Sequence, residues 1–369
     1  MSVRERPSVV EFPNRERVVV RRVEVEPLRH EREFQTVEVQ LTRLNRRERE
    51  GKRIGYWGAH HDRMSTLIHE NTVDERMPEL THDDAIVNGV RLHYVEAGDG
   101  PLVLLLHGFP EFWYSWREQI PALAAAGYHV VAPDMRGYND SEKPHGVDAY
   151  RTDELVADVT GLIDHFGEET AHVVGHDWGG AVAWQVGIDR PERVDKLAVL
   201  NAPHPGRFRE VLRTPSQLRR SWYIFFFQLP WLPELFLSAR GYESIENIFT
   251  DTPTNPDAFT EDDVRRYVEA AAKPGALTGS INYYRALFRQ SVPTQLRSLV
   301  GGSNDSFDVR VPTMLIWGTE DFALGNELTE GLDRWIPDLR IERLPGASHW
   351  VQNDRPERVS DLLVEFFAE

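Results

Sequence analysis

The chain has no cysteine and only four lysines among its 369 residues. Without cysteine it can form no disulfide, hold no metal through thiolates and use no thiol nucleophile. No N-terminal apolar run has the form of a secretory signal. No uninterrupted stretch of about 18 apolar residues occurs, so a membrane-spanning helix is not expected. These absences favour a cytoplasmic protein.

Acidic residues outnumber basic residues by 59 to 42, which gives a formal net charge of −17. A negative surface repels phosphate groups, so neither nucleic acid nor a membrane surface is an expected partner. An acid-rich, lysine-poor surface is typical of adaptation to high salt, because screening weakens repulsion between carboxylates. The competing interpretation is an ordinary acidic protein from a genome that prefers arginine. Full folding and activity at low salt would remove the motivation for a halophilic protein.

The composition changes near residue 77. Residues 1–76 are rich in arginine and glutamate and carry no motif with recognisable chemistry. Short alternating stretches at 23–26 and 37–41 fit the two-residue period of strands. We interpret this segment as a disordered charged extension or as sequence upstream of the true start. A small added β module is the third alternative.

Strand patterns alternate with helical patterns over residues 82–201 and again from residue 313 to the end. This alternation predicts an α/β fold with a mostly parallel sheet, right-handed crossovers and flanking helices. The pair Asn88-Gly89 predicts a type I′ turn in a hairpin over residues 86–94. The other expected strands are 102–106, 130–132, 171–174, 197–201, 313–317 and 339–344. The expected helices are 116–126, 152–166, 180–189 and 356–367.

A stretch without strand periodicity separates the two alternating regions. Residues 205–300 have a helical pattern, many aromatic residues and several prolines. The stretch leaves the sheet after one strand and returns before the next. We therefore expect a helical cap (lid) over the carboxyl ends of the strands, where open α/β sheets bind ligands. The expected domains are a core of residues 77–204 and 301–369 and a cap of residues 205–300.

The most informative motif is Gly175-His176-Asp177-Trp178-Gly179-Gly180, which lies between a strand pattern and a helix pattern. A G-x-nucleophile-x-G turn in that context is the nucleophile elbow of α/β-hydrolases. Glycines flank the central residue because the turn is strained and crowded. Asp177 replaces the usual serine, and a carboxylate that attacks carbon forms an alkyl ester. The alternative is a glycine-rich turn with an incidental aspartate.

Such an ester needs a base to activate water and an acid to orient that base. In the chain order nucleophile, acid, histidine, the base is expected at His349, in the loop after the last strand. The acid is expected at Asp321, with Glu320 as its rival. The other strand end at which such folds carry this acid holds Asn201, which has no carboxylate. His176 should point away from the nucleophile, because neighbours at a sharp turn diverge.

The oxyanion of the ester needs hydrogen-bond donors. The residue after the nucleophile, Trp178, is expected to offer its backbone N–H. A second backbone donor is expected at Phe109, in the loop His107–Glu111, which follows a strand. Pro110 in this loop is a candidate for a cis peptide bond.

Two tyrosines lie in aromatic-rich parts of the expected cap, at Tyr223 and Tyr284. A phenol with a pKa of about 10 can donate a proton to an epoxide oxygen as its C–O bond breaks. Two phenols can share the developing charge. Tyrosine in an aromatic-rich helix usually serves packing, so this interpretation depends on the wider pattern of motifs.

Together these motifs resemble the α/β-hydrolase-fold epoxide hydrolases, over residues 82–369. The matching segments are His107–Glu111, Asp134–Tyr138, Gly175–Gly180, Tyr223–Pro230, Asn282–Arg285, Asp321 and Gly346–Trp350. The resemblance implies no metal and no cofactor. It implies these roles: nucleophile Asp177, charge pair His349 and Asp321, epoxide-oxygen donors Tyr223 and Tyr284, and oxyanion hole Phe109 and Trp178. One departure is Tyr283, where many relatives carry tryptophan.

The expected reaction is hydrolysis of a small, hydrophobic epoxide to a vicinal diol through an aspartyl ester. Aspartate at the elbow is shared with haloalkane and haloacetate dehalogenases, which are the first alternative, and the tyrosine pair favours epoxides. Halide departure would instead need halide-binding N–H donors, and Trp178 could supply one. A non-catalytic ligand-binding protein on this fold is the second alternative. Both a monomer and a homodimer are open.

Overall fold

The computed structural model describes residues 4–11, 17–24, 40–43, 80–299 and 306–369. The chain forms two compact units, Met1–Glu70 and Asn71–Glu369. In the first unit, β1 (Arg4–Glu11), β2 (Arg17–Glu24) and β3 (Gln40–Arg43) form an antiparallel sheet in that order. Of the strands expected at 23–26 and 37–41, residues 23–24 lie in β2 and residues 40–41 in β3, and the remaining residues lie outside the described part of the chain. Our interpretation of residues 1–76 therefore stays a prediction.

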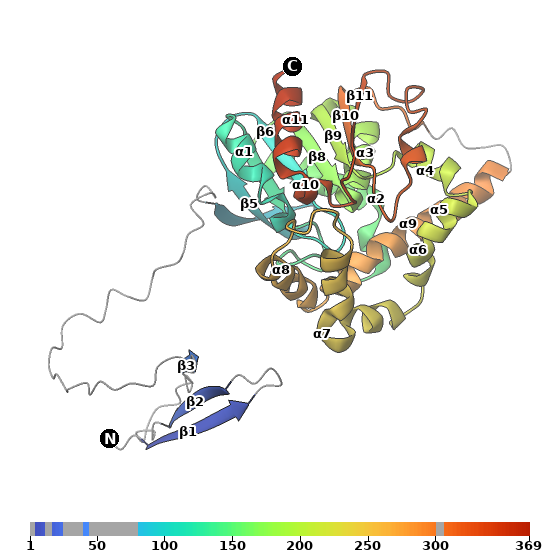
Figure 1. The fold of residues 1–369 in the computed structure, drawn as a ribbon. Helices are drawn as coiled ribbons and strands as arrows, with labels where there is room; N and C mark the ends of the chain where they lie inside the picture. Colours follow the sequence, from blue (N-terminus) through green and yellow to red (C-terminus); the bar gives the residue numbers. More distant parts are fainter. Residues whose placement is uncertain (1–3, 12–16, 25–39, 44–79, 300–305) are drawn as a thin grey trace. The chain divides into compact units, whose positions relative to one another are not determined.

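An eight-stranded sheet forms the centre of the second unit (Figure 1). Its order is β11-β10-β9-β8-β6-β7-β5-β4, with β4, β5 and β7 joined antiparallel and all other neighbours parallel. The prediction of a mostly parallel sheet is thus confirmed. The strands are β4 (Thr81–Val87), β5 (Val90–Ala97), β6 (Leu102–Leu106), β7 (His129–Pro133), β8 (Ala171–His176), β9 (Val194–Leu200), β10 (Thr313–Gly318) and β11 (Leu339–Leu344).

The first hairpin of this sheet turns at Asn88 and Gly89. Both residues have positive φ, 48° and 71°, and the flanking Val87 and Val90 are paired across the strands. Two consecutive positive φ values define the predicted type I′ turn, whose twist matches that of the strands.

Helices cover both faces of the sheet. Figure 1 shows α1 and α11 in front of it and α3 behind it, and α1 packs on α11 while α2 packs on α3. The helices are α1 (Gln119–Ala125), α2 (Thr152–His165), α3 (Asp177–Asp189), α10 (Val351–Asp354) and α11 (Pro356–Ala368). Short 3₁₀ helices are η1 (Trp113–Trp116), η2 (Val147–Tyr150), η3 (Pro191–Arg193) and η4 (Asn326–Thr329).

Two predicted helix starts were wrong. The helix expected from residue 116 begins at Gln119, because Pro121 fits the first turn of a helix and would clash with a carbonyl four residues earlier in a longer one. The helix expected from Gly180 begins at Asp177. The turn after β8 is thus tighter than its glycines alone indicated.

Six helices lie between β9 and β10 in the part of the chain that the structure describes, and we call residues 205–299 the helical insertion. They gather at one end of the sheet in Figure 1. Proline at the first helical position begins α4 and α5, and a capping box between Thr260 and Asp263 begins α8. No helix among the described residues is long and apolar enough to cross a membrane. The helices are α4 (Pro205–Val211), α5 (Pro215–Arg220), α6 (Trp222–Phe226), α7 (Leu232–Asp251), α8 (Glu261–Ala272) and α9 (Ala276–Leu299).

Candidate active site

The turn between β8 and α3 holds Asp177 in a left-handed conformation, with φ of 48°. An L-residue seldom adopts this region without compensation from its surroundings. A Cβ on Gly175 would lie 2.2 Å from the carbonyl oxygen of Gly179. A Cβ on Gly179 would lie 2.1 Å from the carbonyl oxygen of Leu106. Positions 175 and 179 must therefore be glycine. The turn presents the Asp177 side chain at the carboxyl edge of the sheet.

The loop after β6 meets this carboxylate. The backbone N–H of Phe109 donates to Oδ1 of Asp177 at 2.8 Å, and the Phe109–Pro110 peptide bond is cis, as predicted. A Cβ on Gly108 would lie 2.4 Å from Cβ of Asp177, so this close approach requires glycine. Among the described residues, the backbone N–H of Trp178 makes no bond to Asp177. Of the two expected oxyanion donors, only Phe109 therefore contacts Asp177 among the described residues.

His349 lies between two carboxylates from different strand ends. Its Nδ1 is 2.7 Å from Oδ2 of Asp321, and its Nε2 is 3.6 Å from Oδ2 of Asp177. Burial alone would lower the pKa of His349, but the charges of Asp321 and Asp177 hold it well above its ordinary value. The two neighbouring carboxylates therefore favour the protonated form of the ring.

Asp321 is held by four hydrogen bonds, three of them independent of His349. Its Oδ1 accepts from the backbone N–H groups of Ala323 at 2.7 Å and Leu324 at 2.9 Å. Its Oδ2 accepts from the side-chain amide of Asn201 at 2.8 Å. The rival Glu320 is exposed. The structure therefore brings Asp321, and not Glu320, to the imidazole.

Asp177 is more exposed than Asp321, with 18 % of its side chain accessible against 0 %. Burial alone would raise its pKa, but His349, His176 and the N–H of Phe109 together lower it. A lowered pKa keeps the carboxylate ionised near neutral pH. An ionised carboxylate with a free oxygen is a competent nucleophile toward carbon.

The helical insertion brings Tyr223 of α6 and Tyr284 of α9 together beside this carboxylate. Their ring centroids are 5.9 Å apart at an interplanar angle of 83°, and the Tyr284 ring packs edge-on against Trp178 at 4.9 Å. Burial and the charge of Asp177 raise the pKa of both phenols. Both side chains thus carry their protons and lie within electrostatic reach of Asp177.

The chain is similar to known proteins of the α/β-hydrolase fold. The family model for the alpha/beta hydrolase fold matches residues 101–356. The AB hydrolase superfamily protein YfhM of Bacillus subtilis (strain 168) is 44% identical over 76% of this chain and 95% of its own. Epoxide hydrolase 4 of Mus musculus is 39% identical over 76% of this chain and 77% of its own. The chain belongs to the epoxide hydrolase family of the α/β-hydrolase fold.

A solved structure extends the likeness of this hydrolase to three dimensions. A mutant epoxide hydrolase from Bacillus megaterium superposes with a TM-score of 0.70 at 32% identity, covering 78% of this chain and all of its own. Epoxide hydrolase A of Mycobacterium thermoresistibile superposes with a TM-score of 0.68 at 33% identity, covering 78% of this chain and 98% of its own. The sheet and the helical insertion are therefore those of the family.

Tyr283, the departure noted in the sequence, is buried. Its hydroxyl donates to the backbone carbonyl of Arg136 at 2.8 Å, and its ring contacts Trp178 at 5.4 Å. In the hydrolase it is a buried packing residue that supports one wall of the site.

A second buried network was not predicted. His176 points away from the nucleophile, as expected, and its Nδ1 lies 2.7 Å from Oε2 of Glu111. Its Nε2 lies 2.9 Å from the backbone carbonyl of His349, and Gln352 donates to the other oxygen of Glu111 at 3.0 Å. This network fixes the loop that carries the imidazole. The signal available in the sequence was a glutamate directly after Pro110 in the loop that follows a strand.

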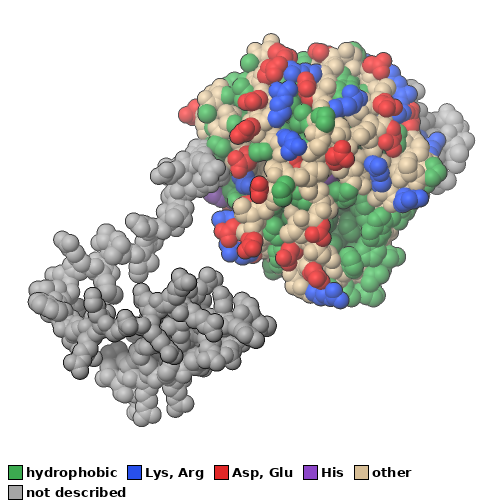
Figure 2. Space-filling view, in the orientation of Figure 1, with side chains coloured by type: hydrophobic (Ala, Val, Ile, Leu, Met, Phe, Trp, Pro, Cys, Tyr) green, Lys and Arg blue, Asp and Glu red, His purple; other side chains and the backbone are tan. Residues whose placement is uncertain are grey.

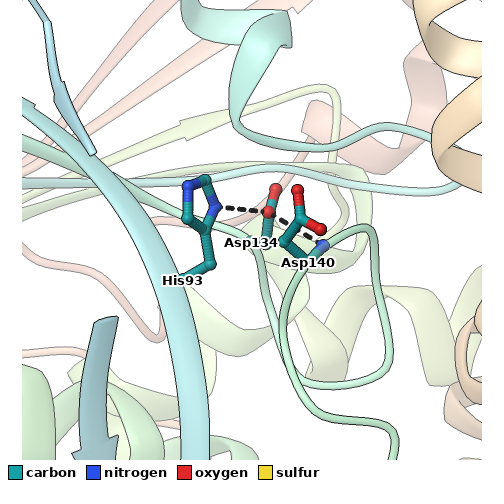
Figure 3. A group of neighbouring side chains, drawn as sticks. All are labelled: His93, Asp134 and Asp140. Atoms are coloured by element: carbon teal, nitrogen blue, oxygen red, sulfur yellow. Dashed lines mark hydrogen bonds and ion pairs between the residues drawn. The ribbon is translucent and has the colours of Figure 1, made fainter. Parts of the chain in front are cut away.

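One group of side chains offers ligand atoms of the kind that bind metals (Figure 3). Oδ2 of Asp134 already accepts from Nδ1 of His93 at 2.7 Å and from the amide of Asn139 at 2.8 Å. Asp140 pairs with Lys273 at 2.6 Å. These donors balance the carboxylates, so we interpret the group as a hydrogen-bonded junction between the sheet and the insertion, with no need for a cation.

Proposed function

We propose that the hydrolase converts an apolar epoxide and water into a vicinal diol through an ester of Asp177. One observation carries the proposal. An ionised carboxylate on a strained turn faces two protonated phenols on one side and a paired imidazole on the other. The names of the relatives support the same reaction class.

In the first half-reaction, an oxygen of Asp177 bonds to a ring carbon as that carbon's bond to the epoxide oxygen breaks. The departing oxygen gains negative charge and takes a proton from Tyr223 or Tyr284. The hydroxyl of Tyr223 has no hydrogen-bond partner among the described residues, so it is free to donate. The second phenol stabilises the same oxygen, which lowers the barrier.

In the second half-reaction, water attacks the ester carbonyl and gives its proton to Nε2 of His349. Formation of the ester removes the negative charge of Asp177, which is one of the two charges that raise the pKa of His349. The pKa therefore falls when a base is needed. Asp321 keeps the ring oriented through Nδ1. The tetrahedral intermediate collapses as its bond to the diol oxygen breaks, and that oxygen, which came from Asp177, takes the proton from Nε2. The proton left on the new Asp177 carboxyl passes to the phenolate, which restores the carboxylate and the phenol.

The N–H of Phe109 supports the charge on the tetrahedral oxygen, because it already contacts Asp177 at 2.8 Å. We assign the second donor role to the backbone N–H of Trp178. Trp178 is the second residue of α3, within the first turn, where a backbone N–H has no intrahelical partner. A small shift of the carboxylate on ester formation would bring it into reach.

The helical insertion acts in this proposal as the cap of the site. Its α6 and α9 carry the two phenols, and Phe227 contacts Phe109 of the core at 5.6 Å and Tyr284 at 4.9 Å. Aromatic rings thus surround the polar atoms of the reaction. This supports an apolar substrate, because apolar walls bind apolar groups and exclude bulk water.

A single-turnover reaction in oxygen-labelled water tests the covalent route. With enzyme in excess, the first diol should be unlabelled, since its new oxygen comes from Asp177. Asp177→Ala should abolish turnover while the melting temperature stays near that of the wild type. Labelled diol in the first turnover would exclude the ester. Halide release from haloalkanes, with no diol from epoxides, would favour the dehalogenase alternative.

A further inference from the structure

The outer surface of the helical insertion is apolar over a short stretch of chain. Between residues 222 and 236, six large apolar side chains are each at least 44 % exposed. Figure 2 shows a continuous hydrophobic area at the lower right, where Figure 1 places α6 and α7. We call the following residues the apolar face: Trp222, Phe225, Leu229, Trp231, Leu235 and Phe236.

Contacts between the two helices make this face one surface. The Phe226 ring lies 5.9 Å from that of Trp222 and 5.7 Å from that of Phe236. Trp231 adopts φ of 53° and is 69 % exposed. A bulky residue in the left-handed region is an outlier, and here the strain holds an indole in solvent. Exposed apolar surface of this kind marks an interaction site.

The charge around the apolar face is opposite to that of the whole chain. Residues 205–221, which directly precede the face, contain five arginines and one acid, so they carry +4, whereas the chain carries −17. Glu234, the acid within residues 222–236, pairs with Arg285 at 2.7 Å. Among the described residues, Arg219 and Arg220 are exposed and form no ion pair. The face is thus bordered by unpaired cations.

We propose that the apolar face binds peripherally to the surface of an anionic lipid bilayer. Tryptophan, phenylalanine and leucine beside arginine is the composition of interfacial helices, with rings at the headgroup level and cations on lipid phosphates. The sequence predicted no membrane contact from the net charge. Screening limits the repulsion between the net negative charge and anionic lipids to roughly 8 Å at physiological salt. The local positive charge therefore determines whether the face attracts these lipids.

A second copy of the chain fits this face less well. Closed dimers use the same patch on both subunits. Such an interface would bring the unpaired Arg219 and Arg220 of both copies to one boundary, and like charges across an interface oppose association. Lipid phosphates complement these charges instead.

Helix α6 links the face to the proposed active site. Trp222 and Phe225 point outward, whereas Tyr223 and Phe227 contact Tyr284 inside. A bilayer at the face would lie one helix away from the proposed active site. Apolar molecules dissolve in a bilayer, so an apolar substrate would be concentrated next to that site. Lipid binding itself does not depend on the proposed reaction.

Vesicle flotation with the full chain tests the proposal. We expect the protein to float with vesicles of phosphatidylcholine and phosphatidylglycerol in equal parts. The double variant Trp222→Ser/Trp231→Ser should lower the partition coefficient roughly tenfold or more. Arg219→Gln/Arg220→Gln should lower it for these vesicles and leave weak binding to pure phosphatidylcholine unchanged. The matched control is Ile86→Ser, which removes an apolar side chain 78 % exposed on β4 and should float like the wild type.

The proposal would be overturned if the wild-type protein stays in the buffer with both vesicle types, or if Ile86→Ser loses as much flotation as the tryptophan variant. It would also be overturned if the wild type does not float but forms a dimer that dissociates in the tryptophan variant. Melting temperatures and turnover of a water-soluble epoxide identify a variant that fails to fold. Flotation without epoxide turnover would support lipid binding and reject only the proposed reaction.

Discussion

Nε2 of His349 lies 3.6 Å from Oδ2 of Asp177, while Nδ1 of the same ring lies 2.7 Å from Oδ2 of Asp321. The first distance exceeds a normal hydrogen bond and the second is a short one. The ring is therefore oriented by Asp321 and only attracted by Asp177. This asymmetry suits a base that must face first a charged carboxylate and then a neutral ester.

His349→Gln should form the ester and fail to hydrolyse it. Glutamine cannot accept the proton of water, so steady-state turnover should fall by roughly 10²–10⁴-fold. Intact-protein mass spectrometry should show an adduct equal in mass to the substrate. The exposed His145 provides the control, because His145→Gln should turn over normally and accumulate no adduct. Full turnover by His349→Gln would remove this residue from the mechanism.

Tyr223→Phe and Tyr284→Phe should each slow ester formation by roughly 10- to 100-fold, and the double variant more than either. Each phenol can partly replace the other because both approach one oxygen. Stopped-flow measurement of the first half-reaction separates this effect from ester hydrolysis, which should change little.

Tyr283→Phe is the matched control for this pair. It removes a hydroxyl bonded to the carbonyl of Arg136, so it should lower the free energy of unfolding by about 1 kcal/mol and leave ester formation unchanged. Equal kinetic losses in all three variants would indicate a packing role for the tyrosines.

Asp321→Asn should shift the pH dependence of ester decay. Decay requires a neutral imidazole, so its rate should rise with pH through the pKa of His349 in the ester. Asp321 raises that pKa, and its removal should move the rising limb to lower pH while the plateau falls. Single-turnover decay measured across a pH series gives the midpoint. A midpoint that stays in place or moves to higher pH would contradict the proposed pairing.

The same pKa makes a prediction for stability. A histidine whose pKa is raised in the folded state stabilises it fully below the unfolded value of about 6.5. That contribution disappears as the pH rises through the folded pKa. Urea unfolding at a series of pH values should therefore show stability declining above about pH 6.5. The decline should be smaller in Asp321→Asn, and an equal decline would assign it to other groups.

Gly108→Ala should disable the nucleophile without removing any polar group. The new Cβ would lie 2.4 Å from Cβ of Asp177, so the carboxylate must move, and ester formation should fall by roughly 100-fold for a displacement near 1 Å. The comparison is Gly187→Ala on α3, where the new Cβ would meet the flexible Leu197 side chain at 2.9 Å. Turnover should survive there, and normal ester formation in Gly108→Ala would show that the site tolerates the shift.

Local patterns predicted most of the fold. The strands at 102–106 and 339–344 have the predicted bounds. The first is fully buried, and a buried strand is a continuous apolar run with clear ends. Helix starts were less certain. For α3 the pattern placed the helix after the glycines, whereas the structure begins it at Asp177. A single left-handed residue closes the turn, and no sequence pattern specifies that φ.

The residues of the candidate site divide in the same way. Asp177 and His349 stood out because each lies in a short motif at a strand end. Asn201 was considered only as the place where a carboxylate was missing, yet its amide donates to Asp321 and its side-chain oxygen accepts from Gly318 at 2.8 Å. This contact joins residues 120 positions apart along the chain. No local pattern reveals it.

The sequence by itself determined the elements and the chemistry: which runs are strands, where the glycines permit a sharp turn, and that a carboxylate stands at its tip. These properties depend on a few neighbouring residues and on each side chain's own functional group. Only the tertiary structure decided which acid holds the imidazole, which tyrosines lie beside Asp177 and which apolar residues stay exposed on the insertion. Those outcomes depend on distances between segments far apart in the chain, and only packing fixes them.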